Sequence, residues 1–395
     1  MARIGIFGGS FNPPHNGHIR AARECVERLA LDRLLLVPDA APPHKALAPD
    51  SPSAQQRYEM VRLAADSIPR TDVSDLELRR SGKSYTVDTL RELQAQYPKD
   101  ELLLLMGTDM FLSFDRWRGP DEIARMAQIV CMHRRATDEA LRQQLAAQTA
   151  RLTAKGAQVV MAENDALELS STTVRRMLAF DCAERYLPPD VLAYIRENGL
   201  YGTAEGRRGL SYDALRAQSL ALHDEKRVPH AIGTSELAKT LGERYGADAA
   251  LCARAGILHD VTKALRAPEQ LALCERYAIP LTPEERENPK LLHAITGAAV
   301  ARNVFGECEP VVSAIRWHTT GRADMRVMEK ILYIADYAEP TRDFPGVERL
   351  RAALERSLDE AVLLGLSMTM EQLRAKGQTV CHDSLAAYDF LSRKG

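Results

Sequence analysis

Apolar residues follow two different patterns in the two halves of the chain. Up to about residue 200, short apolar runs typical of buried strands alternate with stretches of helical period. This alternation predicts a parallel sheet with crossover helices, in a Rossmann-like α/β domain. The expected strands are Ile4–Phe7, Leu34–Val37, Leu102–Met106, Ile129–Met132 and Val159–Met161, and the helices between them include His18–Leu29 and Gln55–Ser67.

After about residue 210 the strand pattern stops, and long amphipathic stretches predict an all-α domain. The region between these two halves contains glycine and charged residues without periodicity, which is typical of a linker, at Gly199–Gly202 and Gly206–Gly209. We therefore expect an α/β domain at 1–203 and a helical domain at 210–395. The helical stretches are 213–226, 230–244, 248–263, 291–305, 309–318, 326–338 and 347–375.

Composition narrows the functional classes. The chain has 395 residues, 45% of them hydrophobic, and a formal net charge of −2, which argues against a protein built to coat nucleic acid. Its seven cysteines are odd in number and never spaced as CxxC, so neither a disulfide framework nor a cysteine zinc site is expected. No apolar run is long enough to span a membrane, and the first residues do not resemble a signal peptide. We expect a cytoplasmic protein without nucleic-acid or membrane partners, and leave a homo-oligomer open.

The sharpest local signal follows the first predicted strand, in the string Gly8-Gly-Ser-Phe-Asn-Pro-Pro-His-Asn-Gly-His18. Gly8 and Gly9 allow the backbone to turn and to approach a ligand closely. Asn16 is a plausible N-cap, and the helix N-terminus behind it favours an anion. His15 and His18 are then expected to face the same phosphate, as imidazolium donors that stabilise its developing charge. A glycine- and proline-rich connection with incidental histidines is the alternative.

A second polar cluster, Ser170-Ser-Thr-Thr-Val-Arg175, stands more than 150 residues further along. Hydroxyl groups at the start of a helix, followed one turn later by an arginine, suit the β- and γ-phosphates of ATP. Alone, such a run is more often an N-cap.

Together, these two strings resemble the HxGH nucleotidyltransferase superfamily, with His15-Asn-Gly-His18 as its signature and Leu169–Arg175 similar to its ISSTxIR motif. Within it, the elements Pro42–Lys45, Ser84–Leu90, Met106–Asp109 and Trp117 resemble nicotinate-nucleotide adenylyltransferase. The resemblance covers roughly residues 1–202. It implies adenylyl transfer from ATP, with Mg²⁺ on the phosphates, to nicotinate mononucleotide.

The resemblance also implies a role for each matching residue. Lys45 and Arg175 would hold phosphates and would act in catalysis together with His15 and His18. The nucleotide would be bound by Gly8, Gly9, Ser10, Phe11, Ser171 and Thr172. Asp109 would bind the adenosine ribose, while Thr86 and Trp117 would lie at the pyridine ring. Simpler readings exist for these residues: Trp117 as a core aromatic, Asp109 as an N-cap, and Lys45 and Thr86 as surface residues.

In the second half, histidines and aspartates interrupt apolar helical stretches. They are His230, His259, Asp260, His293, His318 and Asp336. Burying such groups is costly unless they pair or bind a metal. Nitrogen and carboxylate ligands suit iron, manganese or zinc without choosing among them. For any single histidine, a satisfied core or surface position remains the alternative.

The order His…His-Asp…His…His…Asp resembles the HD-domain phosphohydrolases over about residues 211–395. The strings HDVTK, HTTG and ADYAEPTR are similar to the HD proteins that split diadenosine tetraphosphate into two ADP. By this resemblance His230, His259, Asp260 and Asp336 bind one metal. Asp260 bridges to a second held by His293 and His318, and Lys263 and Arg342 face the phosphates. One or two transition-metal ions are implied, iron first.

Three alternatives stay open. The first domain could prefer nicotinamide mononucleotide, which lacks one charged carboxylate. The second could hydrolyse another phosphoester, such as a dNTP, a cyclic dinucleotide or a guanosine polyphosphate. It could also be a non-catalytic module that binds a metal or a nucleotide.

Overall fold

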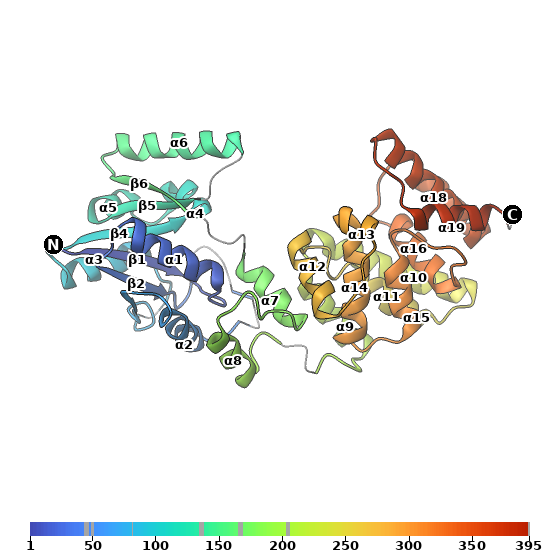
Figure 1. Ribbon diagram of the computed structural model, residues 1–395, viewed down its shortest axis with the longest axis horizontal. Coiled ribbons are helices and arrows are strands. Elements are labelled where there is room, and N and C mark those ends of the chain that lie inside the picture. The colour runs from blue at the N-terminus through green and yellow to red at the C-terminus, as the bar shows by residue number, and fades with distance from the viewer. Residues whose placement is uncertain are drawn as a thin grey trace. The chain divides into compact units, whose positions relative to one another are not determined.

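The computed structural model describes residues 1–42, 47–48, 51–80, 82–133, 138–164, 169–202 and 206–393. The chain divides into two compact units (Figure 1). The first is Met1–Leu178 with Ala183–Thr203, and the second is Ala179–Cys182 with Ala204–Gly395. The short segment Ala179–Cys182, which we expected in the first domain, thus groups with the second unit.

The first unit is built on a six-stranded sheet in the order β3-β2-β1-β4-β5-β6, and all its paired strands are parallel (Figure 1). The five strands predicted from apolar runs are present, which confirms the Rossmann-like α/β domain. The short strand β3 was not predicted. The strands are β1 (Arg3–Gly9), β2 (Arg33–Pro38), β3 (Thr71–Val73), β4 (Glu101–Gly107), β5 (Gln128–His133) and β6 (Val159–Glu163).

Helices cover both faces of this sheet, because alternate strand residues are buried on opposite sides. On one face Ile6 and Leu104 pack with residues of α3, α5 and α6, and on the other Phe7 and Leu36 lie beside Ile19 of α1. The helices are α1 (Asn16–Arg28), α2 (Ala54–Ala65), α3 (Thr86–Gln96), α4 (Thr108–Leu112), α5 (Pro120–Met126), α6 (Glu139–Ala154), α7 (Ser171–Ala179) and α8 (Pro189–Glu197), with a 3-10 turn at Phe114–Arg116.

The strand order places a ligand site at one edge of the sheet. Strands β1 and β4 are neighbours, with Phe7 beside Leu105, but the chain leaves them toward opposite halves of the sheet. In open α/β sheets, ligands bind at such a switch point, outside the carboxyl ends of the strands. The segment that follows Gly9 and the one that follows Gly107 meet at this edge.

The second unit is helical in the described residues, as its sequence predicted (Figure 1). Three predicted stretches have different ends: 213–226 stops being α-helical after Leu222, 248–263 stops being helical after Leu258, and 347–375 is two helices. The helices are α9 (Tyr212–Leu222), α10 (Val228–Tyr245), α11 (Ala249–Leu258), α12 (Ala267–Arg276), α13 (Pro283–Glu287), α14 (Leu292–Asn303), α15 (Glu309–Trp317), α16 (Val327–Ala338), α17 (Val347–Arg356), α18 (Leu358–Ala375) and α19 (His382–Ser392), with 3-10 turns at Glu225–Arg227 and Pro289–Leu291.

Helices α10 and α11 pack closely because glycine stands at their contact. A Cβ on Gly256 would lie 2.5 Å from the Ser235 Cα, and one on Gly242 would lie 2.9 Å from the Ala249 Cα. Ser235 also donates to the carbonyl of Ala253 at 2.7 Å, so this contact carries a polar link as well. The close approach brings His230 of α10 next to the end of α11, where His259 follows.

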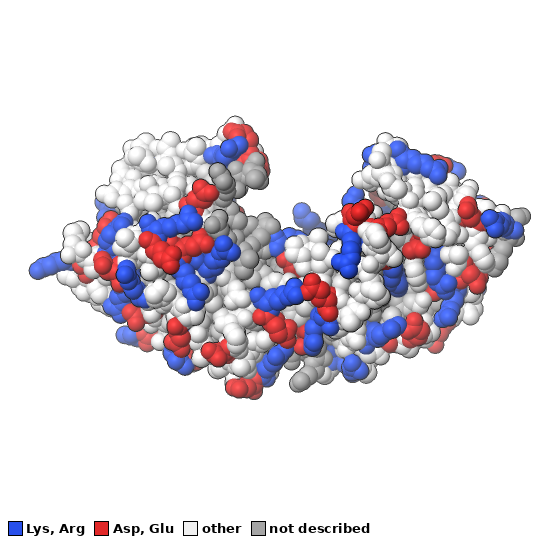
Figure 2. Space-filling view, viewed as in Figure 1, with Lys and Arg blue, Asp and Glu red and all other residues white. Residues whose placement is uncertain are grey.

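The surface of the protein carries charges of both signs. On the face of the protein drawn in Figure 2, basic and acidic side chains are interspersed, in keeping with the formal net charge of −2. None of the described helices combines the length and the apolar character that crossing a bilayer requires.

Candidate active sites

The histidine motif of the first unit lies in the connection from β1 to α1, at the switch point of the sheet. Helix α1 begins at Asn16, and His15 before it has extended backbone angles. The predicted N-cap at Asn16 is therefore wrong: this residue is already helical, and its side-chain amide donates to the Arg185 carbonyl at 3.0 Å. His15 is the residue that enters the helix, and His18 follows in its first turn.

The two histidines form a stacked pair, with ring centroids 3.7 Å apart. The backbone N–H of His15 donates to the His18 Nδ1 at 3.2 Å, so the proton of a neutral His18 ring lies on Nε2. Burial lowers the pKa of His18 to about 4, and burial together with the neighbouring His18 lowers the pKa of His15 well below its usual value. The expectation of imidazolium donors is thus wrong for the free protein. Both rings are neutral near pH 7, because burial disfavours the charged form.

The Ser-Thr-Arg motif of α7 is hydrogen-bonded to the histidine loop. Ser171 Oγ donates to the Pro13 carbonyl at 3.1 Å, and Arg175 Nη1 donates to the Asn12 carbonyl at 2.6 Å. Arg175 also donates to the Thr172 hydroxyl at 3.2 Å. The structure therefore joins two motifs that lie about 160 residues apart in the sequence, next to the carboxyl end of β1.

A buried arginine that the sequence reasoning missed supports the same loop. Arg57 of α2 has 0% exposure and donates to the Ser10 carbonyl and to the Asp39 carbonyl, both at 2.7 Å. Its guanidinium also pairs with the Asp39 carboxylate at 3.2 Å. Arg57 thereby links the loop after β1 to the end of β2. The sequence could have indicated this buried arginine, because Arg57 lies on the apolar face of α2, one turn before Met60.

The remaining residues predicted for this site are distributed around the same edge. Gly8, Gly9 and Ser10 are at least partly exposed at the end of β1, while the Phe11 side chain is buried against His18, with ring centroids 5.1 Å apart. Asp109 is exposed in the first turn of α4, directly after β4. Lys45 lies outside the described residues.

Thr86 and Trp117, predicted at the pyridine ring, occupy neighbouring parts of the first unit. Thr86 is the first residue of α3 and half-buried. Trp117 is half-buried too, packs against the core and lies 5.4 Å from Phe114 between ring centroids. The structure therefore gives Trp117 a packing role, whichever ligand it meets.

In the second unit, the histidines and aspartates predicted as ligands converge on one buried cluster. The His230 Nε2 lies 3.2 Å from the His259 Nε2 and 3.1 Å from the Asp336 Oδ1. On the other side, the His293 Nε2 lies 3.2 Å from the His318 Nε2. These residues belong to α10, α14 and α16 or directly follow the ends of α11 and α15.

Asp260 connects the two sides of the cluster. Its Oδ2 lies 3.4 Å from the His259 Nε2 and 3.7 Å from the His230 Nε2. Its Oδ1 lies 3.4 Å from the His293 Nε2 and 3.6 Å from the His318 Nε2. Each carboxylate oxygen thus faces one pair of histidines, an arrangement that lets one aspartate bridge two ions.

The donor set fits metal ions. Three groups, His230–His259–Asp260, His259–His318–Asp336 and Asp260–His293–His318, each place their ligand atoms within 4.8 Å of one another. The buried Asp260 Oδ1 has no hydrogen-bond partner among the described residues, although a buried carboxylate oxygen needs one. Imidazole and carboxylate ligands suit iron, manganese or zinc.

Hydrogen bonds to the outer ring nitrogens orient all four imidazoles. The Nδ1 atoms of His259, His293 and His318 each donate at 2.7 Å to the carbonyl of the residue three positions earlier, which are Gly256, Lys290 and Ile315. The His230 Nδ1 instead donates at 3.0 Å to the Glu339 carboxylate. In a neutral ring that carries its proton on Nδ1, Nε2 is the atom that can bind a metal at the cluster.

Burial and the neighbouring charges shift the pKa values of the acidic ligands in opposite directions. Burial alone would raise the pKa of Asp260, but the adjacent His259 and its other histidine neighbours hold it well below the usual value. The pKa of Asp336 is lowered as well, because His230, His259 and Arg342 outweigh its burial. Burial and the neighbouring His318 and Lys263 lower the pKa of His293 to about 3. At neutral pH the aspartates are ionised and His293 is neutral, as metal binding requires.

Three cations surround the cluster. Arg342 and Arg227 form ion pairs with Asp336 and Asp260, respectively, and the Lys263 Nζ lies 2.9 Å from the His293 Nε2. Lys263 and Arg342 were predicted to face phosphates. A role for Arg227 was not predicted, because in the sequence it belongs to a short run of charged residues that is typical of an exposed surface.

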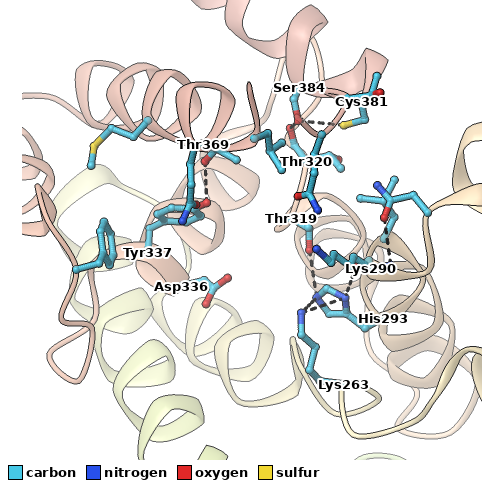
Figure 3. Close-up of a pocket in the computed structure, with 18 of the residues that line it drawn as sticks. Lys263, Lys290, His293, Thr319, Thr320, Asp336, Tyr337, Thr369, Cys381 and Ser384 are labelled. Atoms are coloured by element: carbon cyan, nitrogen blue, oxygen red, sulfur yellow. Dashed lines mark hydrogen bonds between the residues drawn. The ribbon is translucent and has the colours of Figure 1, made fainter. Parts of the chain in front are cut away.

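A cavity of about 1280 Å³ opens above the cluster (Figure 3). Lys263, His293 and Asp336 lie close together in it, and Tyr337 and Thr369 lie to one side of them. The Tyr337 hydroxyl is 2.7 Å from the Thr369 hydroxyl. On the other side are Thr319, Thr320, Lys290, Cys381 and Ser384.

Comparisons with known proteins find a different family model in each half of the chain. Residues 6–177 match the cytidylyltransferase-like family model and residues 227–341 match the HD domain model. A probable nicotinate-nucleotide adenylyltransferase of Pseudomonas syringae pv. tomato is 40% identical over 209 residues, which are 50% of this chain and 93% of that protein. One of Geotalea daltonii is 40% identical over 212 residues, which are 50% of this chain and 98% of that protein.

Among solved structures, the chain is similar over part of its length to a Clostridium acetobutylicum protein described as a predicted HD superfamily hydrolase involved in NAD metabolism. The identity is 35%, the match covers 47% of this chain and 99% of that one, and the TM-score is 0.46. The chain thus belongs, through its N-terminal half, to the nicotinate-nucleotide adenylyltransferase family, and it carries an HD domain in its C-terminal half.

Proposed function

We propose that the chain is a bifunctional enzyme. Its first unit transfers the adenylyl group of ATP to nicotinate mononucleotide, giving deamido-NAD and pyrophosphate. Its second unit hydrolyses diadenosine tetraphosphate symmetrically into two ADP with the help of bound metal ions. The first activity is supported by the family and by the joined histidine and Ser-Thr-Arg motifs, and the second by the cluster around Asp260.

In the first reaction the mononucleotide phosphate attacks the α-phosphorus of ATP, the bond from the α-phosphorus to the bridging oxygen breaks, and pyrophosphate leaves. No protein nucleophile is needed, so the protein contributes positioning and charge stabilisation. The His18 Nε2–H is a donor toward the reacting phosphate, and His15 is the second candidate donor. Arg175, Ser171 and Thr172 would hold the leaving pyrophosphate, whose charge Mg²⁺ and Lys45 would also offset.

Purified protein incubated with ATP, Mg²⁺ and either nicotinate or nicotinamide mononucleotide tests the first activity. We expect the acid to be used with a kcat/KM at least ~10-fold higher than the amide, because a site that pairs one ligand carboxylate rejects the neutral analogue. A preference for the amide would reassign the substrate to nicotinamide mononucleotide. Turnover of neither compound would contradict the proposal for this unit.

In the second unit, metal ions held by the two sides of the cluster would supply a hydroxide and polarise the phosphate that it attacks. Asp260 would hold the ions at a fixed separation through its two oxygens. Lys263, Arg227 and Arg342 carry positive charge next to the same donors, where the phosphate chain would lie. Attack on one inner phosphorus breaks its bond to the central bridging oxygen, and both products leave as ADP.

The size and the layout of the cavity support a long substrate. Ligand pockets usually have volumes of ~300–1,000 Å³, and the cavity here has about 1280 Å³. Its lining extends to both sides of the ligand cluster, toward Tyr337 on one side and toward Lys290 on the other (Figure 3). A substrate bound with its centre at the cluster would have one nucleoside on each side, which favours cleavage in the middle.

The products of diadenosine tetraphosphate distinguish the possible activities of this unit. With iron(II) or manganese we expect ADP alone, and no turnover with a chelator. AMP together with ATP would show asymmetric cleavage. If diadenosine tetraphosphate is not hydrolysed but a dNTP, a cyclic dinucleotide or a guanosine polyphosphate is, that compound would be the substrate. Stoichiometric metal without turnover of any of these would indicate a non-catalytic binding module.

A further inference from the structure

One of the four histidines in the cluster is supported differently from the others. The rings of His259, His293 and His318 are held by backbone carbonyls, but that of His230 is held by the Glu339 carboxylate. An ionised acceptor makes a stronger hydrogen bond than a carbonyl and increases the electron density that the ring offers to a metal. The side of the cluster that contains His230 is therefore chemically distinct from the side that contains His293 and His318.

Glu339 is built into the turn after α16 as a fully enclosed group. Its side chain has 0% exposure, and its Oε1 also accepts from the Thr341 hydroxyl at 2.5 Å. Its Oε2 accepts from the Thr341 backbone N–H at 2.7 Å. The turn itself is held by Arg351, which donates to the Ala338 and Glu339 carbonyls at 3.0 and 2.9 Å. Burying a carboxylate is costly, and the hydrogen bonds from His230 and Thr341 offset that cost while Arg351 fixes the backbone around it.

Helix α10 leaves space for this carboxylate by means of a glycine. A Cβ on Gly233 would lie 2.4 Å from the Glu339 Oε2 and 3.3 Å from its Cδ. Glycine in a helix interior is destabilising relative to alanine. Gly233 lies one turn after His230, so the same helix carries both the ligand and the space for its support.

We propose that Glu339 is a positioning residue for the metal site of His230, and that Gly233 provides the space that this role requires. The carboxylate keeps the proton of His230 on Nδ1 and its Nε2 directed at the cluster. It strengthens binding of the metal held by His230, His259, Asp260 and Asp336, and not of the one held by His293 and His318. The inference rests on the proposed metal site, but not on any substrate.

Metal binding by the Glu339→Gln variant tests this role directly. The full-length protein, stripped of metal, is titrated with Mn²⁺, and free Mn²⁺ is measured by electron paramagnetic resonance. We expect one of the two Mn²⁺ equivalents to bind about 10- to 100-fold more weakly than in the unchanged protein, and the other to bind as before. Equal weakening of both equivalents, or of neither, would overturn the proposal.

A matched control is available on helix α16, which ends directly before Glu339. Glu329 of α16 is also buried and also accepts side-chain and backbone hydrogen bonds, from Ser313 at 2.6 Å and from the Arg326 N–H at 2.8 Å, but it contacts none of the histidines of the cluster. Glu329→Gln is therefore expected to leave both Mn²⁺ affinities unchanged. Adenylyl transfer by the first unit, measured on every sample, reports that the rest of the chain is intact.

A double-mutant cycle separates this role from a merely structural one. Gly233→Ala should weaken the same Mn²⁺ equivalent in the presence of Glu339, because the added methyl group displaces the carboxylate. In a Glu339→Ala background the same change should have little further effect, since the atom that it displaces is gone. Additive losses would show that Gly233 acts through packing alone. If the unchanged protein bound no Mn²⁺, the proposed metal site itself would be wrong.

Discussion

Replacing Asp260 with asparagine is expected to abolish metal binding on both sides of the cluster and to reduce hydrolysis of diadenosine tetraphosphate by ~10³-fold or more. Its two oxygens face separate pairs of histidines, so the substitution replaces the ligand oxygen on one side with an NH₂ group and leaves the other side a neutral amide oxygen. An amide also lacks the negative charge that offsets the charge of two ions. Losing several kcal/mol of transition-state stabilisation corresponds to a loss of this size.

Metal content after dialysis and kcat/KM for the tetraphosphate measure both effects on the same sample. Asp343→Asn serves as the matched control, because Asp343 is exposed next to Arg342 and lies outside the ligand cluster. Adenylyl transfer should remain at its original rate in both variants. An Asp260→Asn protein that kept two metal ions and its hydrolytic activity would refute the bridging role.

His18→Ala is expected to lower kcat for adenylyl transfer by about 10²- to 10³-fold and to leave the fold intact. The loss is that of one preorganised donor to a phosphate whose charge grows in the transition state. Folding should survive because alanine favours helix in the first turn of α1. The substitution also removes the stacking partner of the His15 ring and the acceptor of the His15 backbone N–H.

His18→Gln provides the informative comparison, because its amide N–H lies near the position of the histidine Nε2–H. We expect this variant to recover part of the rate that the alanine variant loses. Arg20→Ala, on the exposed side of the same helix, should behave like the unchanged protein. If the alanine and glutamine variants both turned over normally, the histidine motif would not be the reacting site.

The sheet of the first unit was predictable because parallel strands buried on both faces consist of nearly continuous apolar runs. The strand β3, with the sequence Thr71-Asp72-Val73, was missed because it is a short, polar edge strand. The break between α17 and α18 was also missed, although it has a local cause. Ser357 has extended backbone angles and accepts from the Glu360 N–H, which starts a new helix without glycine or proline.

For the sites, the sequence identified residues whose chemical type is unusual in its surroundings, and it missed those whose role depends on burial. The histidines and aspartates of the second unit stand out on apolar stretches, and the structure brings them together. Arg57 and Glu339 look like ordinary charged helix or turn residues, and only their tertiary contacts show their roles. The charge state of His15 and His18 was misjudged for the same reason, since desolvation depends on the folded environment.

The backbone supports of three histidines affect how the cluster tolerates mutation. Every amino acid has a carbonyl group, so no substitution at Gly256, Lys290 or Ile315 can delete the oxygen that holds His259, His293 or His318. The support of His230 is a side chain and can be lost by a single codon change. Among these four supports, sequence drift can therefore erode the cluster most directly at Glu339, and a chain that is losing metal affinity should show its first changes there and at Gly233.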